Sequence, residues 1–191
     1  MISKEWSPDK PRFVMEWLKG RALMVRLSNR EGADIALISA YAPGEHLSAK
    51  AREDFWQGLD RGIGSVPRRT CVVLGLDANG HVGLLTRLPA CGSKGAEPET
   101  DNGRALCEIW NGNQLRILST LRRGQGGSTH KNKHRIYFLA ASGWAMRLIL
   151  SGGGRDEKAP LAAGMVSRDH WPVSVHMREP RRMAGRGPED P

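Results

Sequence analysis

Cys-Val-Val-Leu-Gly-Leu-Asp-Ala-Asn-Gly, residues 71–80, is an apolar run that ends in Asp77 and Asn79. A buried strand with short polar side chains at its end holds those side chains on a rigid support. Upstream, apolar side chains recur at every fourth position of residues 47–63, which predicts an amphipathic helix. A helix followed by a buried strand is typical of a layered α/β fold.

Other segments predict further strands around this pair. Residues 22–27 and 35–40 are expected to form an antiparallel hairpin, and the nearly continuous apolar character of residues 35–40 predicts burial on both faces. Asp-Asn-Gly at residues 101–103 is expected to cap a second helix. The remaining predicted segments are strands at residues 115–120, 135–141, 146–150 and 172–177, and a flexible glycine-rich connection from residue 151.

Length and composition indicate one globular domain. The chain has 191 residues, of which 39% are hydrophobic, and this is enough for a single core. We expect a loosely ordered segment over residues 1–19, one domain over residues 20–178 and a disordered tail over residues 179–191.

The charge balance favours a polyanionic partner such as nucleic acid. The chain carries 29 Lys and Arg residues against 20 Asp and Glu residues, a formal net charge of +9. A basic isoelectric point without functional meaning is an equally good interpretation of this number. A Gly-rich loop could grip a phosphate backbone, or it could be only a solvated loop, and its candidate contacts are Arg122, Arg123, Lys131, Lys133 and Arg135.

The cysteines do not suggest a disulfide framework. Cys71, Cys91 and Cys107 are odd in number and scattered, and there is no Cys-x-x-Cys pair for structural zinc. Cys71 opens the apolar run and is interpreted as a small buried hydrophobe. We therefore expect a reducing intracellular compartment, which includes the nucleus. The N-terminus lacks a signal-peptide pattern, and no segment of about eighteen apolar residues predicts a membrane span.

Polar side chains at two predicted strand ends could form one catalytic site. Asp77 could orient or deprotonate a water, and the Asn79 amide could hydrogen-bond a phosphate oxygen, with both side chains leaving the sheet on one side. An Asx-turn is the alternative for Asp-x-Asn-Gly. His170, directly after Asp169, could stabilise a transition state or protonate a leaving oxygen, or it could be a surface histidine. Tyr41 could donate to a phosphate or simply pack at a turn.

If the two strand ends meet, this set of side chains suits metal-assisted attack on a phosphodiester. The histidines at positions 46, 81 and 176 have no ligand-like spacing with the cysteines and are interpreted as incidental.

Five segments, in order, resemble the endonuclease/exonuclease/phosphatase superfamily with its DNase I-like fold. They are most similar to the apurinic-endonuclease-like domain of non-LTR (LINE-type) retrotransposons. The segments are the Tyr-Ala-Pro strand at residues 38–43, Asp-x-Asn at 73–83, Asn-Gly-Arg at 101–106, the strand at 115–120 and Asp-His-x-Pro-Val at 167–173.

The resemblance implies a four-layer α/β/β/α sandwich and a Mg²⁺-dependent phosphodiesterase that acts on DNA. It assigns water orientation to Asp77, phosphate binding to Asn79 and Tyr41, metal or site geometry to Asp169, and transition-state stabilisation to His170.

The sequence departs from this family in three ways. The similarity begins in mid-domain, so we expect a partial sandwich that lacks the N-terminal strands, with their Asn and their metal-binding Glu. Tyr137 stands where the family has the Asp that orients the catalytic histidine, so His170 is expected to lose its partner, and His130 replaces a Trp. Because a lost catalytic carboxylate costs several kcal/mol of transition-state stabilisation, we expect weak activity or none.

Three hypotheses follow from these observations. The first is a truncated endonuclease-like domain of retrotransposon origin. The second is a nucleic-acid-binding module without catalysis, and the third is an inert fragment such as a pseudogene product.

Overall fold

The structure is a computed structural model that describes residues 13–28, 33–84, 88–92, 96–121, 128–131, 134–156 and 170–178. In chain order the elements are β1 Phe13–Trp17, β2 Ala22–Ser28, β3 Asp34–Tyr41, α1 Ala49–Gly64, β4 Cys71–Asp77, α2 Asp101–Gly112, β5 Leu115–Ile117, α3 Leu118–Leu121, β6 Tyr137–Ser142, α4 Gly143–Met146, β7 Ile149–Arg155 and β8 Val173–Met177.

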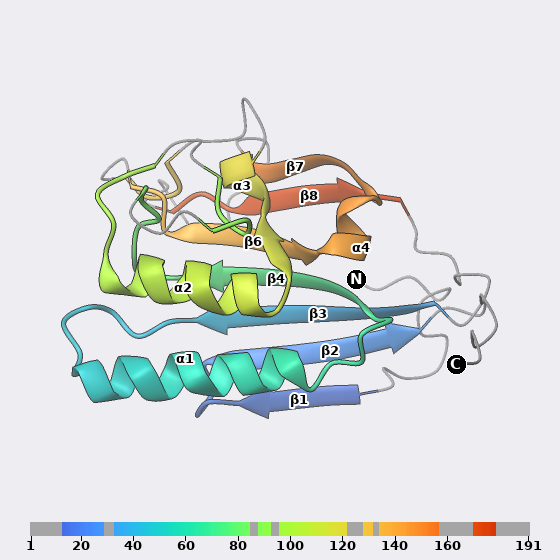
Figure 1. The fold of residues 1–191 in the computed structure, drawn as a ribbon, viewed down its shortest axis with the longest axis horizontal. Coiled ribbons are helices and arrows are strands. Elements are labelled where there is room, and N and C mark those ends of the chain that lie inside the picture. Colours follow the sequence, from blue (N-terminus) through green and yellow to red (C-terminus); the bar gives the residue numbers. More distant parts are fainter. Residues whose placement is uncertain are drawn as a thin grey trace, which may run out of the picture.

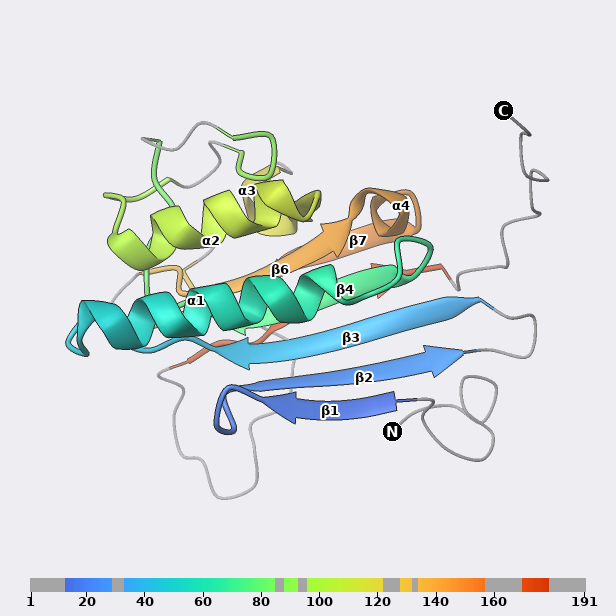
Figure 2. The same ribbon diagram turned by 60° about the horizontal axis from the view of Figure 1, so that its bottom comes forward.

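The strands form two sheets. The larger has six strands in the order β1-β2-β3-β4-β6-β5, and β7 pairs with β8 in the smaller sheet. The predicted hairpin is confirmed, because β2 and β3 pair antiparallel over their whole length. β3 and β4 are parallel and are connected through α1, whereas β4 and β6 are antiparallel. Both α1 and α2 lie over the same face of the large sheet (Figures 1 and 2).

Local sequence explains where the two long helices begin. The Ser48 side chain accepts a hydrogen bond from the Ala51 amide at the start of α1. The cap of α2 is Thr100, whose hydroxyl accepts from the Gly103 amide, one residue before the predicted Asp-Asn-Gly cap. Each helix buries an apolar stripe against the sheet, with Leu59 of α1 fully buried.

Strand β4 lies between two hydrophobic cores. Val72 and Leu74 belong to the core beneath α1 and α2, whereas Cys71 and Val73 belong to a second core with residues of α4 and β7. Successive residues of a strand point to opposite faces, so β4 supplies both cores in alternation. The described layers are therefore helix, large sheet and small sheet, which confirms the predicted partial α/β sandwich.

Several element boundaries differ from the prediction. On the face away from the helices, Ile35 of β3 belongs to the second core but Leu37 is exposed, so β3 is not buried on both faces along its whole length. The predicted strand at residues 115–120 ends at Ile117 and continues as α3. The predicted strand at residues 146–150 begins only at Ile149, because the Ser142 side chain caps the short helix α4.

Two segments are more regular than expected. The stretch predicted as a flexible connection from residue 151 belongs to β7, where Gly152 and Gly153 have positive φ and the pairing with β8 is irregular. Glycine permits this backbone within a bulged strand. Residues Phe13–Trp17, within the segment expected to be loosely ordered, form β1 and pair with β2.

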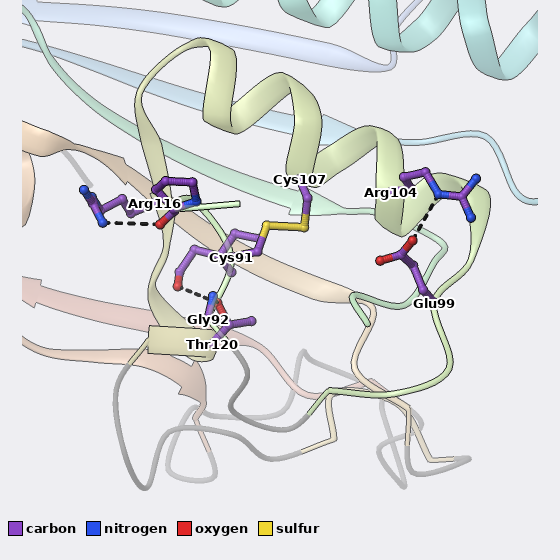
Figure 3. The surroundings of a disulfide bond; sticks show 9 residues. Cys91, Gly92, Glu99, Arg104, Cys107, Arg116 and Thr120 are labelled. Carbon is purple, nitrogen blue, oxygen red and sulfur yellow. Dashed lines mark hydrogen bonds and ion pairs between the residues drawn. A yellow bond between two sulfur atoms is a disulfide. The ribbon is translucent and has the colours of Figure 1, made fainter. Parts of the chain in front are cut away.

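A disulfide joins Cys91 to Cys107, contrary to the expectation of no disulfide (Figure 3). The segment around Cys91 returns to α2 because the Ile117 amide donates to the Ala90 carbonyl and the Gly92 amide donates to the Thr120 hydroxyl. The Cα atoms of the two cysteines are thereby 6.0 Å apart. A loop contact, not sequence spacing, brings the two thiols together.

Cys71 is a buried hydrophobe as predicted, and burial raises the pKa of its thiol to about 12. Within the part of the chain that the structure describes, no helix is long and apolar enough to cross a membrane.

Candidate active site

Three adjacent strands bring a row of polar side chains to one edge of the large sheet. Tyr41 at the end of β3 is the register partner of Asp77 at the end of β4, and Asp77 is the register partner of Tyr137 at the start of β6. Register partners on neighbouring strands point to the same face. By the alternation along β4, this is the face that carries Cys71 and Val73, toward the small sheet.

Asp77 and Asn79 form a tight turn directly after β4. The Asn79 amide N–H donates to Oδ1 of Asp77 at 3.0 Å, and Asn79 has a φ of 43°. The Asn79 side-chain amide donates to the carbonyl of Ala42 at 2.8 Å. The strand therefore stops at Asp77, and the two side chains do not alternate along a continuing strand as predicted. The alternative of an Asx-turn is therefore present. It lies at the sheet edge that carries Tyr41, Asp77 and Tyr137, which is called the rim from here on.

Buried Asn102 holds this turn in place. Its side-chain N–H groups donate to the carbonyls of Pro43 at 2.8 Å and Asn79 at 3.2 Å. Its carbonyl oxygen accepts from the indole of Trp56 at 3.0 Å. One amide thus ties α2, α1 and the loop after β3 to the Asp77 turn. From the sequence, Asn102 was predicted as part of a helix cap and of the Asn-Gly-Arg segment, and neither prediction indicates this role.

His170 has a partner at the rim. The Tyr137 hydroxyl hydrogen-bonds Nδ1 of His170, and the two rings are stacked with centroids 5.5 Å apart. The ring of His130 meets His170 edge-on at 4.8 Å, and the two residues form an isolated β-bridge. The expectation that His170 loses its orienting partner is therefore wrong. A carboxylate accepts a hydrogen bond from an imidazole nitrogen, and a phenol can either accept such a hydrogen bond or donate one.

Thr129 fixes the position of Tyr137. Its buried hydroxyl accepts from the amides of Ile136 at 2.9 Å and Tyr137 at 3.0 Å. The carbonyl of Thr129 also accepts from the Trp171 amide, next to His170. A single turn therefore supports both members of the Tyr137–His170 pair.

Burial changes the acid–base properties of Asp77 at the rim. Burial raises the pKa of Asp77, and this effect exceeds the opposing effects of the Asn79 N–H and of the charges on His170 and His130. A carboxylate with a raised pKa is a stronger base than an exposed one. The rim therefore combines a candidate base, Asp77, with a candidate acid, His170.

The other predicted site residues have different surroundings. The Tyr41 side chain is 52% exposed, and the Arg21 guanidinium lies 5.4 Å from the centre of its ring. Lys131 is exposed, whereas Arg135 is only 4% exposed and lies near Glu97. The predicted residues outside the described part of the chain are Asp169, Arg122, Arg123 and Lys133.

Two hollows in the described structure lie away from the rim. One, of about 460 Å³, lies at the opposite end of the sheet between the C-terminus of α1 and α4, and it includes Thr70, Asn113 and Trp144. The other is a groove between α1 and α2. Neither hollow includes a residue of the rim, so the candidate site is assigned from the side chains of the rim.

A second polar cluster was missed from the sequence. Side chains of His81, Glu97 and His134 meet near the same end of β4. His81 was interpreted as incidental because it has no ligand-like spacing with the cysteines, whereas its partners in the structure, Glu97 and His134, come from distant segments of the chain.

The fold is similar to solved nuclease structures. No family model and no curated protein matches the sequence. The endonuclease domain of TRAS1, a telomere-specific non-LTR retrotransposon, matches at 18% identity with a TM-score of 0.60, covering 87% of this chain and 69% of that one.

NExo from Neisseria gives two further matches. The 3′-5′ exonuclease from Neisseria meningitidis matches at 15% identity with a TM-score of 0.60, covering 87% of this chain and 71% of that one. A variant of the 3′ phosphatase NExo bound to a product DNA hairpin matches at 15% identity with a TM-score of 0.63, covering 89% and 72%. Together with the sandwich described above, these likenesses identify the fold of this chain as that of the DNase I-like superfamily.

Proposed function

We propose that this chain is an endonuclease-like phosphodiesterase domain of retrotransposon origin that acts on DNA, and that the scissile phosphodiester binds at the rim. The observation that carries this proposal is the row of Tyr41, Asp77 and Tyr137 across three neighbouring strands, with His170 hydrogen-bonded to Tyr137. The row gathers a base, an acid and hydroxyl donors at one open edge, as phosphodiester hydrolysis requires.

In this proposal Asp77 orients and deprotonates the attacking water. Burial raises its pKa, which strengthens the carboxylate as a base, while the Asn79 N–H holds Oδ1 in one orientation. The exposed Tyr41 hydroxyl and the Asn79 side-chain amide can donate to phosphate oxygens. These donors would stabilise charge that develops on the phosphate.

His170 acts on the opposite side of the phosphorus. Because Nδ1 is engaged by the Tyr137 hydroxyl, Nε2 is the nitrogen that remains to protonate the leaving oxygen or to donate to the phosphate. A neutral phenol orients the imidazole but stabilises its charged form less than a carboxylate does. We therefore expect slower hydrolysis than in an enzyme whose histidine is paired with Asp.

Mg²⁺ is the cofactor that the proposal includes. Among the described rim residues only Asp77 supplies a carboxylate, and Oδ1 of that carboxylate already accepts from Asn79. Mg²⁺ is commonly held by one or two carboxylates together with waters and substrate phosphate oxygens. In this proposal Asp169, which lies outside the described residues, would help to hold the ion, which when bound would polarise the phosphate, while Asp77 acts on the water.

Two observations support DNA as the substrate. The similar structures include a retrotransposon endonuclease domain and a phosphatase bound to a DNA hairpin. The chain itself carries a net charge of +9, and Lys131, beside the His130–His170 contact, is exposed. Arg135 is not included in the proposed DNA surface because it is buried.

The test is nicking of a supercoiled plasmid with Mg²⁺. Asp77→Asn, which keeps the size of the side chain, should lower the nicking rate by about 100-fold or more. Asp54→Asn is the matched control, because Asp54 is exposed on α1 and pairs only with Lys50 among the described residues. Equal nicking by the wild type and by Asp77→Asn would refute the catalytic proposal.

A nucleic-acid-binding module without catalysis is the second candidate. It is favoured by the single carboxylate of the described rim together with the basic charge. This candidate predicts binding to a DNA duplex that weakens steeply with salt and is unchanged in Asp77→Asn, with no nicking by either protein.

A further inference from the structure

His81, Glu97 and His134 converge from three separate segments of the chain. His81 lies in the loop after β4, Glu97 in the segment before α2, and His134 just before β6. Nδ1 of His134 lies 3.0 Å from Oε2 of Glu97, and Nδ1 of His81 lies 3.8 Å from the same oxygen. Potential ligand atoms of the three side chains all lie within 4.8 Å of one another.

Hydrogen bonds outside the cluster hold each of these residues. The Glu97 amide donates to the Val82 carbonyl, and Oε1 of Glu97 accepts from the Arg135 amide at 2.8 Å, which leaves Oε2 toward the imidazoles. The His81 amide donates to the Thr100 hydroxyl at 3.0 Å. Among these contacts, the one to Oε1 of Glu97 orients a ligand side chain, as outer contacts do in metal centres.

The backbone of His134 is held in the same way. Its carbonyl accepts from the amides of Thr129 and His130. The turn that supports the Tyr137–His170 pair therefore also positions His134.

We propose that His81, Glu97 and His134 form a binding site for a divalent transition metal ion of the Zn²⁺ type. Two imidazoles and one carboxylate are ligands that Zn²⁺ accepts, whereas Mg²⁺ prefers oxygen ligands alone. The site is separate from the Mg²⁺ chemistry proposed for Asp77, because it uses different residues and a different class of ion.

The exposure of the cluster suits reversible binding. The side chains of His81 and Glu97 are 21% and 20% exposed, and that of His134 is 50% exposed. The two rings are stacked with centroids 4.4 Å apart. Because an imidazole binds a metal in the plane of its ring, the half-exposed His134 ring must turn on binding. Three protein ligands also leave at least one position for water.

The competing account is a metal-free network in which the histidines only hydrogen-bond Glu97. The guanidinium of buried Arg135 lies near Glu97, and its positive charge opposes a second cation there. The two accounts differ in one observable property, which is stoichiometric binding of Zn²⁺.

Metal binding is measured on the full chain after chelator treatment. Calorimetric titration with Zn²⁺ should show one saturable site, and Co²⁺ should give visible absorption bands typical of mixed nitrogen and oxygen ligands. His134→Gln and Glu97→Gln should each weaken Zn²⁺ binding by about 100-fold or more, since even outer contacts of metal ligands contribute 10- to 100-fold. Mg²⁺ should not compete with Zn²⁺.

His46→Gln and His176→Gln are matched controls, because both histidines are exposed and lie outside the cluster. They should bind Zn²⁺ as the wild type does. Thermal melts without metal show whether each variant is folded, and half-exposed His134 is the position least expected to disturb folding. Absence of a saturable Zn²⁺ site in the wild type, or equal affinity in folded His134→Gln, would overturn the proposal. Plasmid nicking is read separately, so failure of one proposal leaves the other testable.

Discussion

Replacing Asn102 by Ala should destabilise the fold more than other polar substitutions on α2. Asn102 is only 1% exposed, and its side chain makes three hydrogen bonds, to the Trp56 indole and to the carbonyls of Pro43 and Asn79. Alanine would leave all three partners without this contact, and the contacts to Trp56 and Pro43 are buried. Trp56 belongs to the main core, so its indole N–H would be buried without an acceptor.

The magnitude follows from the number of lost bonds. Each buried hydrogen bond contributes about 1 kcal/mol net, and an unsatisfied buried group costs about 1–3 kcal/mol. Three lost bonds therefore predict a destabilisation of about 3 kcal/mol or more. For a chain of this length, each kcal/mol shifts Tm by roughly 2–4 °C, so Tm should fall by roughly 6–12 °C.

Urea denaturation of the wild type and the variant gives the difference in the free energy of unfolding. Asn113→Ala is the matched control, because Asn113 caps the same helix and hydrogen-bonds exposed Asp60 and the Ile109 carbonyl. The control should lose about 1 kcal/mol, because its side-chain hydrogen bonds are exposed or only partly buried. If Asn102→Ala and Asn113→Ala cost the same, the buried network is not what holds the Asp77 turn, and this reasoning fails.

Three further predictions concern the rim and the disulfide. Thr129→Ala should lower the free energy of unfolding in urea by about 2 kcal/mol and slow plasmid nicking, because two partly buried amides, including that of Tyr137, lose their acceptor. Thr129→Ser should retain both properties. Because burial raises the pKa of Asp77, its favourable contribution to folding is present at acidic pH and is lost as pH rises through the folded-state pKa. Asp77→Asn should therefore raise Tm at neutral pH but not at acidic pH, and an equal rise at both would contradict this. Reducing the Cys91–Cys107 bond, which spans a sequence separation of 16, should cost about 3 kcal/mol in urea denaturation, and the double Ser variant should not respond to reductant.

Much of the fold can be predicted where one periodic pattern determines an element. The fourfold spacing of residues 47–63 predicts α1, and the apolar run from Cys71 predicts β4, because each pattern reflects burial of a continuous face. The short elements cannot be predicted in this way. Helix α4 depends on one cap by Ser142, and β7 contains Gly152 and Gly153, which usually interrupt strands. Pairing with β8 stabilises β7 in spite of its composition.

The candidate site shows a different limit of sequence reasoning. Asp77 can be found because it directly follows a buried strand, and that signal is local. The cluster of His81, Glu97 and His134 has no local signal, since its members meet only when the loops after β4 and before α2 and β6 fold against each other.

Tyr137 could be seen in the sequence but was misinterpreted. By residue type alone, Tyr137 in place of Asp was interpreted as the loss of the side chain that orients His170. In the structure, the Tyr137 hydroxyl hydrogen-bonds Nδ1 of His170, a nitrogen to which a carboxylate could also hydrogen-bond. What changes is the charge of the partner and not the presence of a partner. The charge of the side chain beside His170 can therefore differ while a hydrogen bond to its imidazole is kept.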